Sequence, residues 1–208
     1  MSEVPSQPLI AVDVVPLAVA GGRVEIGTAI RRFEPFLGRE ALPGVLLASG
    51  ELIEQAAARA LAEKAGIDSF HALLQVGTFD RPGRDPRSHA ISIAFVAVVA
   101  EGVGTGHWHP APTGGLGLPF DHDAIIAAAL DEAGHHLWTD PAFSRALTGD
   151  EFTGPDAVGL EAALTGARSH PSNVLRALAA NARLERVGST RSGARGRPAT
   201  LWRWREPV

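Results

Sequence analysis

The chain has 208 residues and a formal net charge of −4 at pH 7, and 45% of its residues are hydrophobic and 20% charged. At roughly 100 to 200 residues per domain, this length allows one large domain or a medium-sized domain with a small one, and the composition excludes wholesale disorder and a collagen-like chain. The sequence contains no cysteine, which excludes disulfides, cysteine nucleophiles and thiolate metal sites.

Strands and helices alternate among the elements predicted for the first 140 residues. Apolar, β-rich residues on both sides of Gly21-Gly22 predict a hairpin, and small apolar side chains at helical spacing predict a helix that ends at Gly66 in the αL conformation. Asp121 is expected to cap a second helix. The predicted strands cover residues 10–19, 23–30, 73–78 and 90–99, and the predicted helices cover residues 51–65 and 122–134. This alternation predicts a mixed α/β layer architecture.

The pattern changes after Asp150. Helices predicted at residues 155–164 and 172–182 precede two short strands, which flank a segment rich in glycine and arginine, residues 188–198. This order is the outline of a winged helix, although ordinary packing of helices on a hairpin gives the same order. We therefore expect two domains, residues 1–147 and residues 148–208.

Charge is distributed unevenly between the two parts of the chain. Residues 1–150 carry 10 basic and 18 acidic side chains, a balance of −8, whereas residues 151–208 carry 9 arginines and 5 acidic side chains, a balance of +4. A basic segment on an acidic body is typical of an appended polyanion-binding module; a chance fluctuation in a short segment is the alternative. No stretch reaches the roughly 20 apolar residues of a membrane span and residues 1–8 carry no export signal, so we expect a cytoplasmic protein.

A motif surrounds the first long predicted helix and resembles the Nudix box in unbroken register. Val45 stands where the box has its second glycine, and Ala60 and Lys64 stand where it has two of its glutamates. The residues that match the box are Leu42-Pro43-Gly44, Gly50-Glu51, Arg59, Glu63 and Gly66-Ile67.

The resemblance implies a metal site that this chain has largely lost. Nudix hydrolases hold Mg²⁺ or Mn²⁺ on a diphosphate with carboxylates at three positions on one helix face, which here are Ala60, Glu63 and Lys64. Two unit charges 4 Å apart interact by about 4 kcal/mol at an effective dielectric near 20, so the ammonium of Lys64 would repel a divalent ion. We therefore expect no hydrolase activity and no bound metal, with Glu51 and Glu63 as vestiges. The resemblance also implies that Glu51 pairs with Arg59 to hold the loop against the helix.

Over residues 8–204 the chain resembles the NrtR group, the Nudix-related transcriptional regulators of NAD metabolism. The resemblance implies a Nudix-type α/β/α sandwich with a mixed sheet, followed by a small C-terminal winged-helix domain. It further implies a homodimeric regulator, a repressor, that binds palindromic operator DNA and senses ADP-ribose or a related NAD-derived nucleotide as its effector. The segments that carry it are residues 8–15, Arg31-Arg32 before Pro35-Phe36, residues 79–87, Phe120-Asp121-His122 and residues 193–204.

Several basic and aromatic residues are candidates for the ligand site that this resemblance implies. Arginines pair bidentately with phosphates, and Lys64 could take the place of the missing metal on a diphosphate. Phe36 or Phe79 could stack on an adenine ring. The ordinary alternatives are surface cations and core phenylalanines, and Asp13 could bond either to ligand or to backbone. The candidates are Arg31, Arg32, Phe36, Arg39, Lys64, Phe79, Arg84 and Arg87.

The candidates for DNA contact lie in the C-terminal part. Asn173 and Arg176 fall in the expected recognition helix, where asparagine can bond to adenine and arginine to guanine or phosphate. Trp202 and Trp204 share one strand face by alternation and are expected to pack beneath the wing. A solvated turn is the alternative for the three wing arginines, which are Arg191, Arg195 and Arg197.

Other functions are also compatible with the sequence. An ADP-ribose pyrophosphatase with residual activity would need metal ligands from elsewhere, such as Glu40, Glu54 or Asp80. A regulator of the same architecture that responds to a sugar metabolite, or a ligand-binding protein that has lost DNA recognition, would also fit. His107 and His109 lack the helical spacing and the carboxylate partners of a zinc site, so we expect them to be surface residues.

Overall fold

The computed structural model describes residues 7–20, 23–111, 114–166, 170–190 and 199–206. Among these residues a seven-stranded mixed sheet forms the centre of the N-terminal part, with the order β3-β2-β1-β6-β5, while β4 pairs with β1 and β7 with β2. The strands are β1 (Leu9–Ala20), β2 (Arg23–Ile30), β3 (Glu40–Ala41), β4 (Gly44–Leu46), β5 (Ala72–Phe79), β6 (Ala90–Val98) and β7 (His107–Pro110).

The register of the sheet explains which strands were predictable. β1 and β2 form the predicted hairpin, with Leu17 opposite Ile26, and β1 runs parallel to β6, with Val12 opposite Ile93. The short strands β3, β4 and β7 were not predicted, because they lie in segments rich in glycine and proline and become strands only by pairing with β1 and β2.

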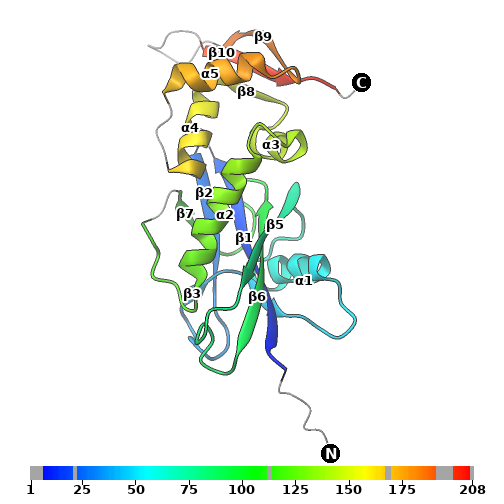
Figure 1. Ribbon diagram of the computed structural model, residues 1–208, viewed down its shortest axis with the longest axis vertical. Coiled ribbons are helices and arrows are strands. Elements are labelled where there is room, and N and C mark those ends of the chain that lie inside the picture. The colour runs from blue at the N-terminus through cyan, green and yellow to red at the C-terminus, as the bar shows by residue number, and fades with distance from the viewer. Residues whose placement is uncertain (1–6, 21–22, 112–113, 167–169, 191–198, 207–208) are drawn as a thin grey trace, which may run out of the picture.

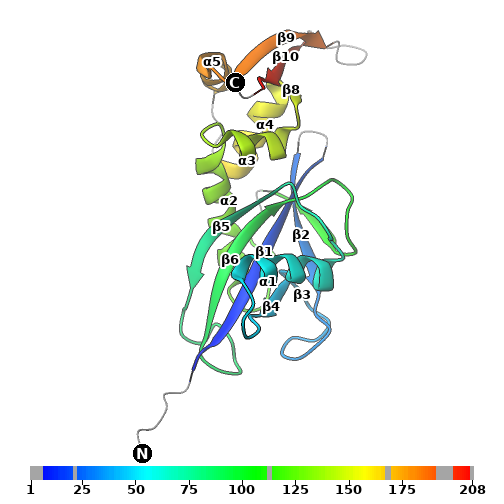
Figure 2. The same ribbon diagram turned by 90° about the vertical axis from the view of Figure 1, so that its right-hand side faces the viewer.

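One face of the sheet is covered by a helix with small side chains. Helix α1 (Ile53–Ala60) continues as a wider turn, η1 (Leu61–Ala65), and ends at Gly66 with φ of 67° in the αL conformation, as predicted. Ala56, Ala57 and Ala60 are fully buried on the sheet, which lets the helix approach closely. Figure 2 shows α1 in front of the sheet.

Two further helices contribute to the core on the opposite face. Helix α2 (His122–His136) buries Ile125, Ile126 and Ala129, and α3 (Pro141–Thr148) begins at Asp140, whose side chain accepts hydrogen bonds from two helix N–H groups. The resulting α/β/α layering confirms the fold class that the sequence predicted (Figures 1 and 2). Asp121 is the N-cap residue of α2, as predicted, and its backbone carbonyl accepts hydrogen bonds from the N–H groups of Ala124 and Ile125. Its side chain caps no helix N–H, because its carboxylate binds Arg84.

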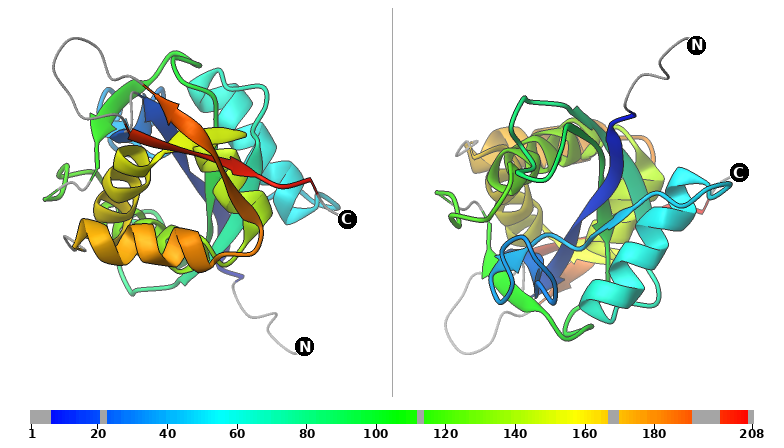
Figure 3. Two further views of the ribbon diagram at one scale, coloured as in Figure 1. Left: turned by 90° about the horizontal axis from the view of Figure 1, so that it is seen from above. Right: turned by 90° about the horizontal axis from the view of Figure 1, so that it is seen from below.

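The remaining elements form a C-terminal module at one end of the molecule (Figures 1 and 3). They are β8 (Glu151–Thr153), α4 (Gly154–Thr165), α5 (Pro171–Ala180), β9 (Leu184–Thr190) and β10 (Ala199–Trp204), and the strands pair in the order β8-β10-β9. Trp202 and Trp204 are both buried in the core of this module together with Val174 and Leu178, which confirms that they pack beneath the hairpin.

Helix α4 belongs to two cores at once. Leu160, Ala163 and Leu164 pack into the core that α2 and the sheet form, whereas Ala157 packs into the core of the C-terminal module. Trp138, just after α2, packs against both cores and stacks on Phe152 with ring centroids 5.5 Å apart. The two parts of the chain are therefore joined through packed side chains. No helix within the described ranges is long and apolar enough to cross a membrane.

Candidate functional site

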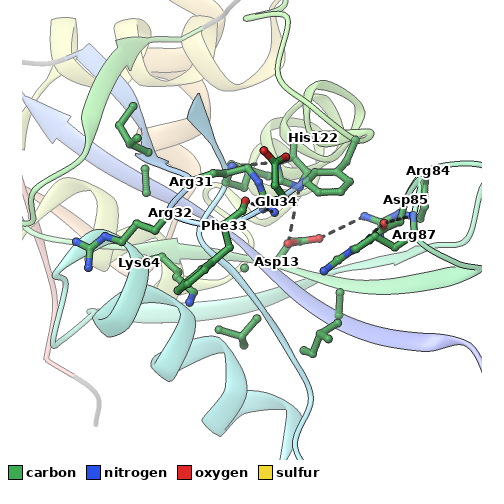
Figure 4. A pocket seen from close by; sticks show the side chains of 18 of the residues that line it. Asp13, Arg31, Arg32, Phe33, Glu34, Lys64, Arg84, Asp85, Arg87 and His122 are labelled. Carbon is green, nitrogen blue, oxygen red and sulfur yellow. Dashed lines mark hydrogen bonds and ion pairs between the residues drawn. The ribbon is translucent and has the colours of Figure 1, made fainter. Parts of the chain in front are cut away.

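A cleft of about 390 Å³ opens where β1, β2 and β4 meet the end of α1 and the η1 turn. The loop between β5 and β6 and the start of α2 complete its walls (Figure 4). Its lining combines buried ionisable groups at the floor, cations at the rim and two phenylalanine rings, Phe33 and Phe120. Such a concave site with convergent polar groups is the usual form of a small-molecule site.

The floor is built on a buried arginine between two aspartates. Arg84 Nη2 lies 2.8 Å from Asp121 Oδ1 and 3.3 Å from Asp13 Oδ2, and the Arg84 side chain is only 3% exposed. Burial acts to lower the pKa of Arg84, but its bonds and attraction to Asp121 and Asp13 outweigh this and raise it. Ser92 Oγ also donates to Asp13 Oδ2 at 2.6 Å. Arg84 therefore fixes the floor, and its charge is already neutralised by protein.

His122 stands beside this network with one ring nitrogen committed. Its Nδ1 accepts a hydrogen bond of 2.9 Å from the backbone N–H of Leu42. Burial lowers the pKa of His122, so the ring is neutral at pH 7, and a neutral ring whose Nδ1 accepts carries its proton on Nε2. Nε2 lies 3.8 Å from Asp13 Oδ1.

The rim of the cleft is cationic. Arg31, Arg32, Lys64 and Arg87 all line it. Arg31 donates to the Pro35 carbonyl at 2.7 Å and lies over the Phe120 ring; its pKa is lowered by burial and then by the neighbouring charge of Arg87. Arg87 forms a bidentate pair with Asp85, whose hydrogen bond raises the pKa of Arg87.

The helix beside the rim is tied to its preceding loop by the expected pair. Arg59 binds Glu51 through two hydrogen bonds of 2.8 Å and also donates to the Leu46 carbonyl. The Arg59 guanidinium and the backbone N–H of Ala48 lower the pKa of Glu51 to about 2. Glu51 therefore serves the shape of the loop.

The three positions that correspond to the metal ligands of the Nudix box have very different surroundings. Ala60 is fully buried against the sheet. Glu63, half exposed, lies 3.7 Å from Arg59 Nη1 and 3.6 Å from Lys64 Nζ. Lys64 lines the cleft, and its ammonium lies 6.0 Å from the centre of the Phe33 ring.

Three of the predicted ligand residues lie outside the cleft. Arg39 donates to the Gly117 carbonyl at 2.7 Å, Phe36 packs edge-on against Phe120, and Phe79 packs against the core beneath α2. The structure does not place these three residues in the lining of this cleft, and their contact with a ligand remains untested. The other predicted residues, Arg31, Arg32, Lys64, Arg84 and Arg87, line the cleft, and their contact with a ligand remains a prediction.

Sequence reasoning missed several residues of the cleft. His122 and Phe120 stood in a quoted segment but were interpreted as the start of a helix, and Phe33 and Asp85 gave no separate signal. Asp13 was noticed as a charged residue within an apolar strand, and that signal did lead to the floor of the site.

A second polar cluster lies outside the cleft, on the sheet edge formed by β2, β3 and β7. Glu40 bonds to His107 Nδ1 at 2.6 Å and His109 Nε2 at 2.7 Å and accepts from Thr28 Oγ1 at 2.8 Å. These bonds, His107 first, lower the pKa of Glu40 to about 2. Both histidines thus have the carboxylate partner that the sequence did not indicate. Within the described part of the chain, no three His, Asp or Glu side chains are arranged to hold a metal ion.

The predicted DNA-contact residues divide into two groups. Asn173 and Arg176 lie on the exposed face of α5, whose opposite face buries Val174 and Leu178. Arg191, Arg195 and Arg197 lie outside the described residues.

Comparison with known proteins gives matches of two kinds. The NUDIX domain family model matches residues 8–137. An ADP-ribose pyrophosphatase from Methanocaldococcus jannaschii is 42% identical over 73 residues, which are 35% of this chain and 42% of the relative; the chain thus spans less than half of that relative.

Solved structures match over most of the chain. NrtR from Shewanella oneidensis is 26% identical with a TM-score of 0.72, covering 95% of this chain and 94% of that one. The same protein complexed with a 27mer DNA is 24% identical over 94% and 93% of the two chains, also at 0.72. Its NUDIX domain complexed with ADP ribose is 24% identical at 0.53, covering 63% and 94%.

Proposed function

Because the chain belongs to the NUDIX domain family, we propose that it is a DNA-binding transcriptional regulator, a repressor, whose Nudix domain senses ADP-ribose or a related NAD-derived nucleotide. The observation that carries this proposal is the similarity to Shewanella oneidensis NrtR over 95% of this chain, a span that includes the C-terminal module. That protein has been solved with a 27mer DNA, and its NUDIX domain with ADP ribose.

The cleft supports a nucleotide effector. Arg31, Arg32, Lys64 and Arg87 bring four cations to one rim, and guanidinium groups bind phosphate oxygens through paired, charge-assisted hydrogen bonds. Arg87 pairs with Asp85, and Lys64 lies within ion-pair distance of Glu63. Arg31 and Arg32 have no such carboxylate partner among the described residues. Half of the positive charge at the rim, that of Arg31 and Arg32, is therefore open to a diphosphate.

We propose that the effector is bound and not cleaved. Mg²⁺ requires nearly octahedral oxygen coordination with carboxylate ligands, and the corresponding helix positions offer a buried methyl group, a glutamate in contact with two cations and an ammonium. These residues do not fit a divalent ion, so we assign the chain no resident metal or cofactor. Lys64 would supply the positive charge instead.

The C-terminal module is proposed to bind DNA as part of a homodimer on a palindromic operator. The exposed face of α5 presents Asn173 and Arg176. An α-helix fits into the major groove of B-DNA. Arg195 and Arg197, which follow β9 and precede β10 in the sequence, are proposed to contact phosphates. Because α4 packs into both cores, a change at the N-terminal core can alter the placement of α5.

The test measures DNA binding and its response to the effector in one assay. Fluorescent duplexes that tile the region upstream of the protein's own gene are titrated with the full chain at several salt concentrations, with and without ADP-ribose. We expect salt-sensitive binding whose affinity changes with ADP-ribose. In Arg195→Ala/Arg197→Ala the slope of log affinity against log salt should fall by about 2, since each lost phosphate contact removes about 0.9, whereas Arg81→Ala should match wild type. No shift with any duplex would refute the regulator.

One observation favours a second function, the hydrolysis of ADP-ribose. The similarity to the Methanocaldococcus jannaschii ADP-ribose pyrophosphatase reaches 42% identity, although over only 35% of this chain. Mg²⁺-dependent release of AMP from ADP-ribose by the purified protein, at a rate that Glu63→Gln abolishes, would establish this function in place of passive sensing.

A further inference from the structure

A donor and an acceptor face each other at the floor of the cleft without bonding. His122 Nε2 lies 3.8 Å from Asp13 Oδ1, which is too far for a hydrogen bond. Figure 4 shows the two side chains pointing toward one another. Both residues line the cleft, yet their side chains are only 3% and 8% exposed. Among the described residues, Trp202 Nε1 is the only fully buried side-chain nitrogen or oxygen without a partner. His122 Nε2 and Asp13 Oδ1 are therefore accessible from the cleft, and a group bound there can bond to both.

The donor is fixed by the backbone of the neighbouring loop. The N–H of Leu42 occupies His122 Nδ1 at 2.9 Å, and the ring is neutral, so its remaining proton is on Nε2. The ring cannot change its tautomer without losing the bond to Leu42. Nε2–H is therefore a permanent donor, directed at the space in front of Asp13.

The acceptor is fixed by the buried ion pair. Asp13 Oδ2 accepts from Ser92 Oγ at 2.6 Å and from Arg84 Nη2 at 3.3 Å. Asp13 Oδ1 receives no hydrogen bond from any residue that the structure describes. The bonds to Oδ2 hold the carboxylate in one rotation, and Oδ1 is left as an acceptor toward the cleft.

A hydroxyl group matches this pair chemically, because its oxygen both accepts and donates. An oxygen about 2.8 Å from each atom would lie within hydrogen-bond distance of both. An ionised phosphate oxygen has no proton to donate, and the Asp13 carboxylate repels it. The floor therefore selects against phosphate, whereas the rim attracts it.

We propose that the Asp13–His122 pair is a recognition site for a sugar hydroxyl, and that the ligand of the cleft is a phosphorylated sugar. The hydroxyl accepts from His122 Nε2–H and donates to Asp13 Oδ1, while its phosphates bind the cations at the rim. This inference rests on the proposed effector-binding role of the cleft and adds the two residues that contact the sugar: a polyphosphate or a base without a sugar hydroxyl would not bond to this pair.

The test uses a variant that removes the donor and keeps its support. In His122→Asn the amide oxygen can still accept from the N–H of Leu42, while the amide NH2 takes the position of the ring carbon Cδ2 and falls one bond short of Nε2. Calorimetric titration of the full chain with ADP-ribose and ribose 5-phosphate should show about tenfold weaker binding in the variant, the effect of one lost hydrogen bond to a buried partner. Binding of inorganic pyrophosphate should stay unchanged. Equal losses for sugar phosphates and pyrophosphate, or no loss for either, would overturn the hydroxyl site.

If His122→Asn does not fold, a second measurement on the wild-type protein tests the hydroxyl site. In the wild-type protein labelled with ¹⁵N at histidine, ADP-ribose should shift the Nε2 signal of the buried ring, and pyrophosphate should not. An unmoved signal with ADP-ribose bound overturns the site. The two proposals can fail separately. If the protein is not a regulator, it does not bind DNA, but its binding of ribose 5-phosphate and pyrophosphate is unaffected. If wild type binds no sugar phosphate more tightly than pyrophosphate, the hydroxyl site is wrong whatever the protein does with DNA.

Discussion

Replacing Arg84 by methionine should destabilise the N-terminal part severely. The substitution keeps most of the side-chain volume but leaves Asp13 and Asp121, 8% and 9% exposed, buried without their shared cation. Removing one partner of a buried ion pair costs about 3 to 5 kcal/mol. For a chain of this size each kcal/mol lowers the melting temperature by about 2 to 4 °C, so we expect a loss of about 10 °C.

Circular dichroism during thermal and urea unfolding measures this loss. Arg81→Met, three residues earlier and exposed, is the matched control and should lie within about 0.5 kcal/mol of wild type. The double variant Arg84→Met/Asp121→Asn should be destabilised by less than the sum of its single variants, because the two residues are in direct contact. If Arg84→Met is as stable as Arg81→Met, the two carboxylates do not depend on Arg84 and this description of the floor is wrong.

Three further predictions follow from the site and the core. Lys64→Ala should weaken pyrophosphate binding about tenfold in calorimetric titration while the distant Arg23→Ala does not; equal affinities would mean that Lys64 does not replace a metal. Because Arg59 lowers the pKa of Glu51 from about 4.5 to about 2, this pair contributes stability above pH 4.5 that is lost as pH falls toward 2; the difference in melting temperature between wild type and Glu51→Gln should therefore close over that range, and a constant difference would contradict the pairing. Leu160→Ala should cost about 2 to 5 kcal/mol in urea unfolding, and a value near zero would mean that α4 is not part of the N-terminal core.

Elements with a long hydrophobic pattern could be predicted from the sequence, whereas elements that exist through tertiary pairing could not. The strands β1, β2, β5 and β6 and the helix before Gly66 each repeat apolar residues often enough to show their period. β7 has only four residues, within a loop rich in glycine and proline, and becomes a strand because it lies against β2. No local pattern contains that information.

The site shows the same division more sharply. The motif placed Glu51 next to Arg59 correctly, since both positions lie in one continuous register. Asp121, in contrast, has the right residue type and position for a helix cap. Its carboxylate nevertheless binds Arg84, 37 residues earlier in the chain, and not the N–H groups of the helix. Phe36 and Arg39 satisfy each other and nearby loops. Which charges are already neutralised by protein depends on contacts across the fold, and the sequence does not display these.

The double membership of α4 has a mechanical consequence. From Pro141 to Thr165 the chain runs through α3, β8 and α4 with connections of only a few residues, and the same helix is embedded in both hydrophobic interiors. A swinging motion about a soft joint in this stretch would tear Leu160 or Ala157 from its neighbours. The C-terminal module is therefore expected to move as a rigid body together with the sheet. In a calorimeter, the whole chain should unfold in a single endotherm.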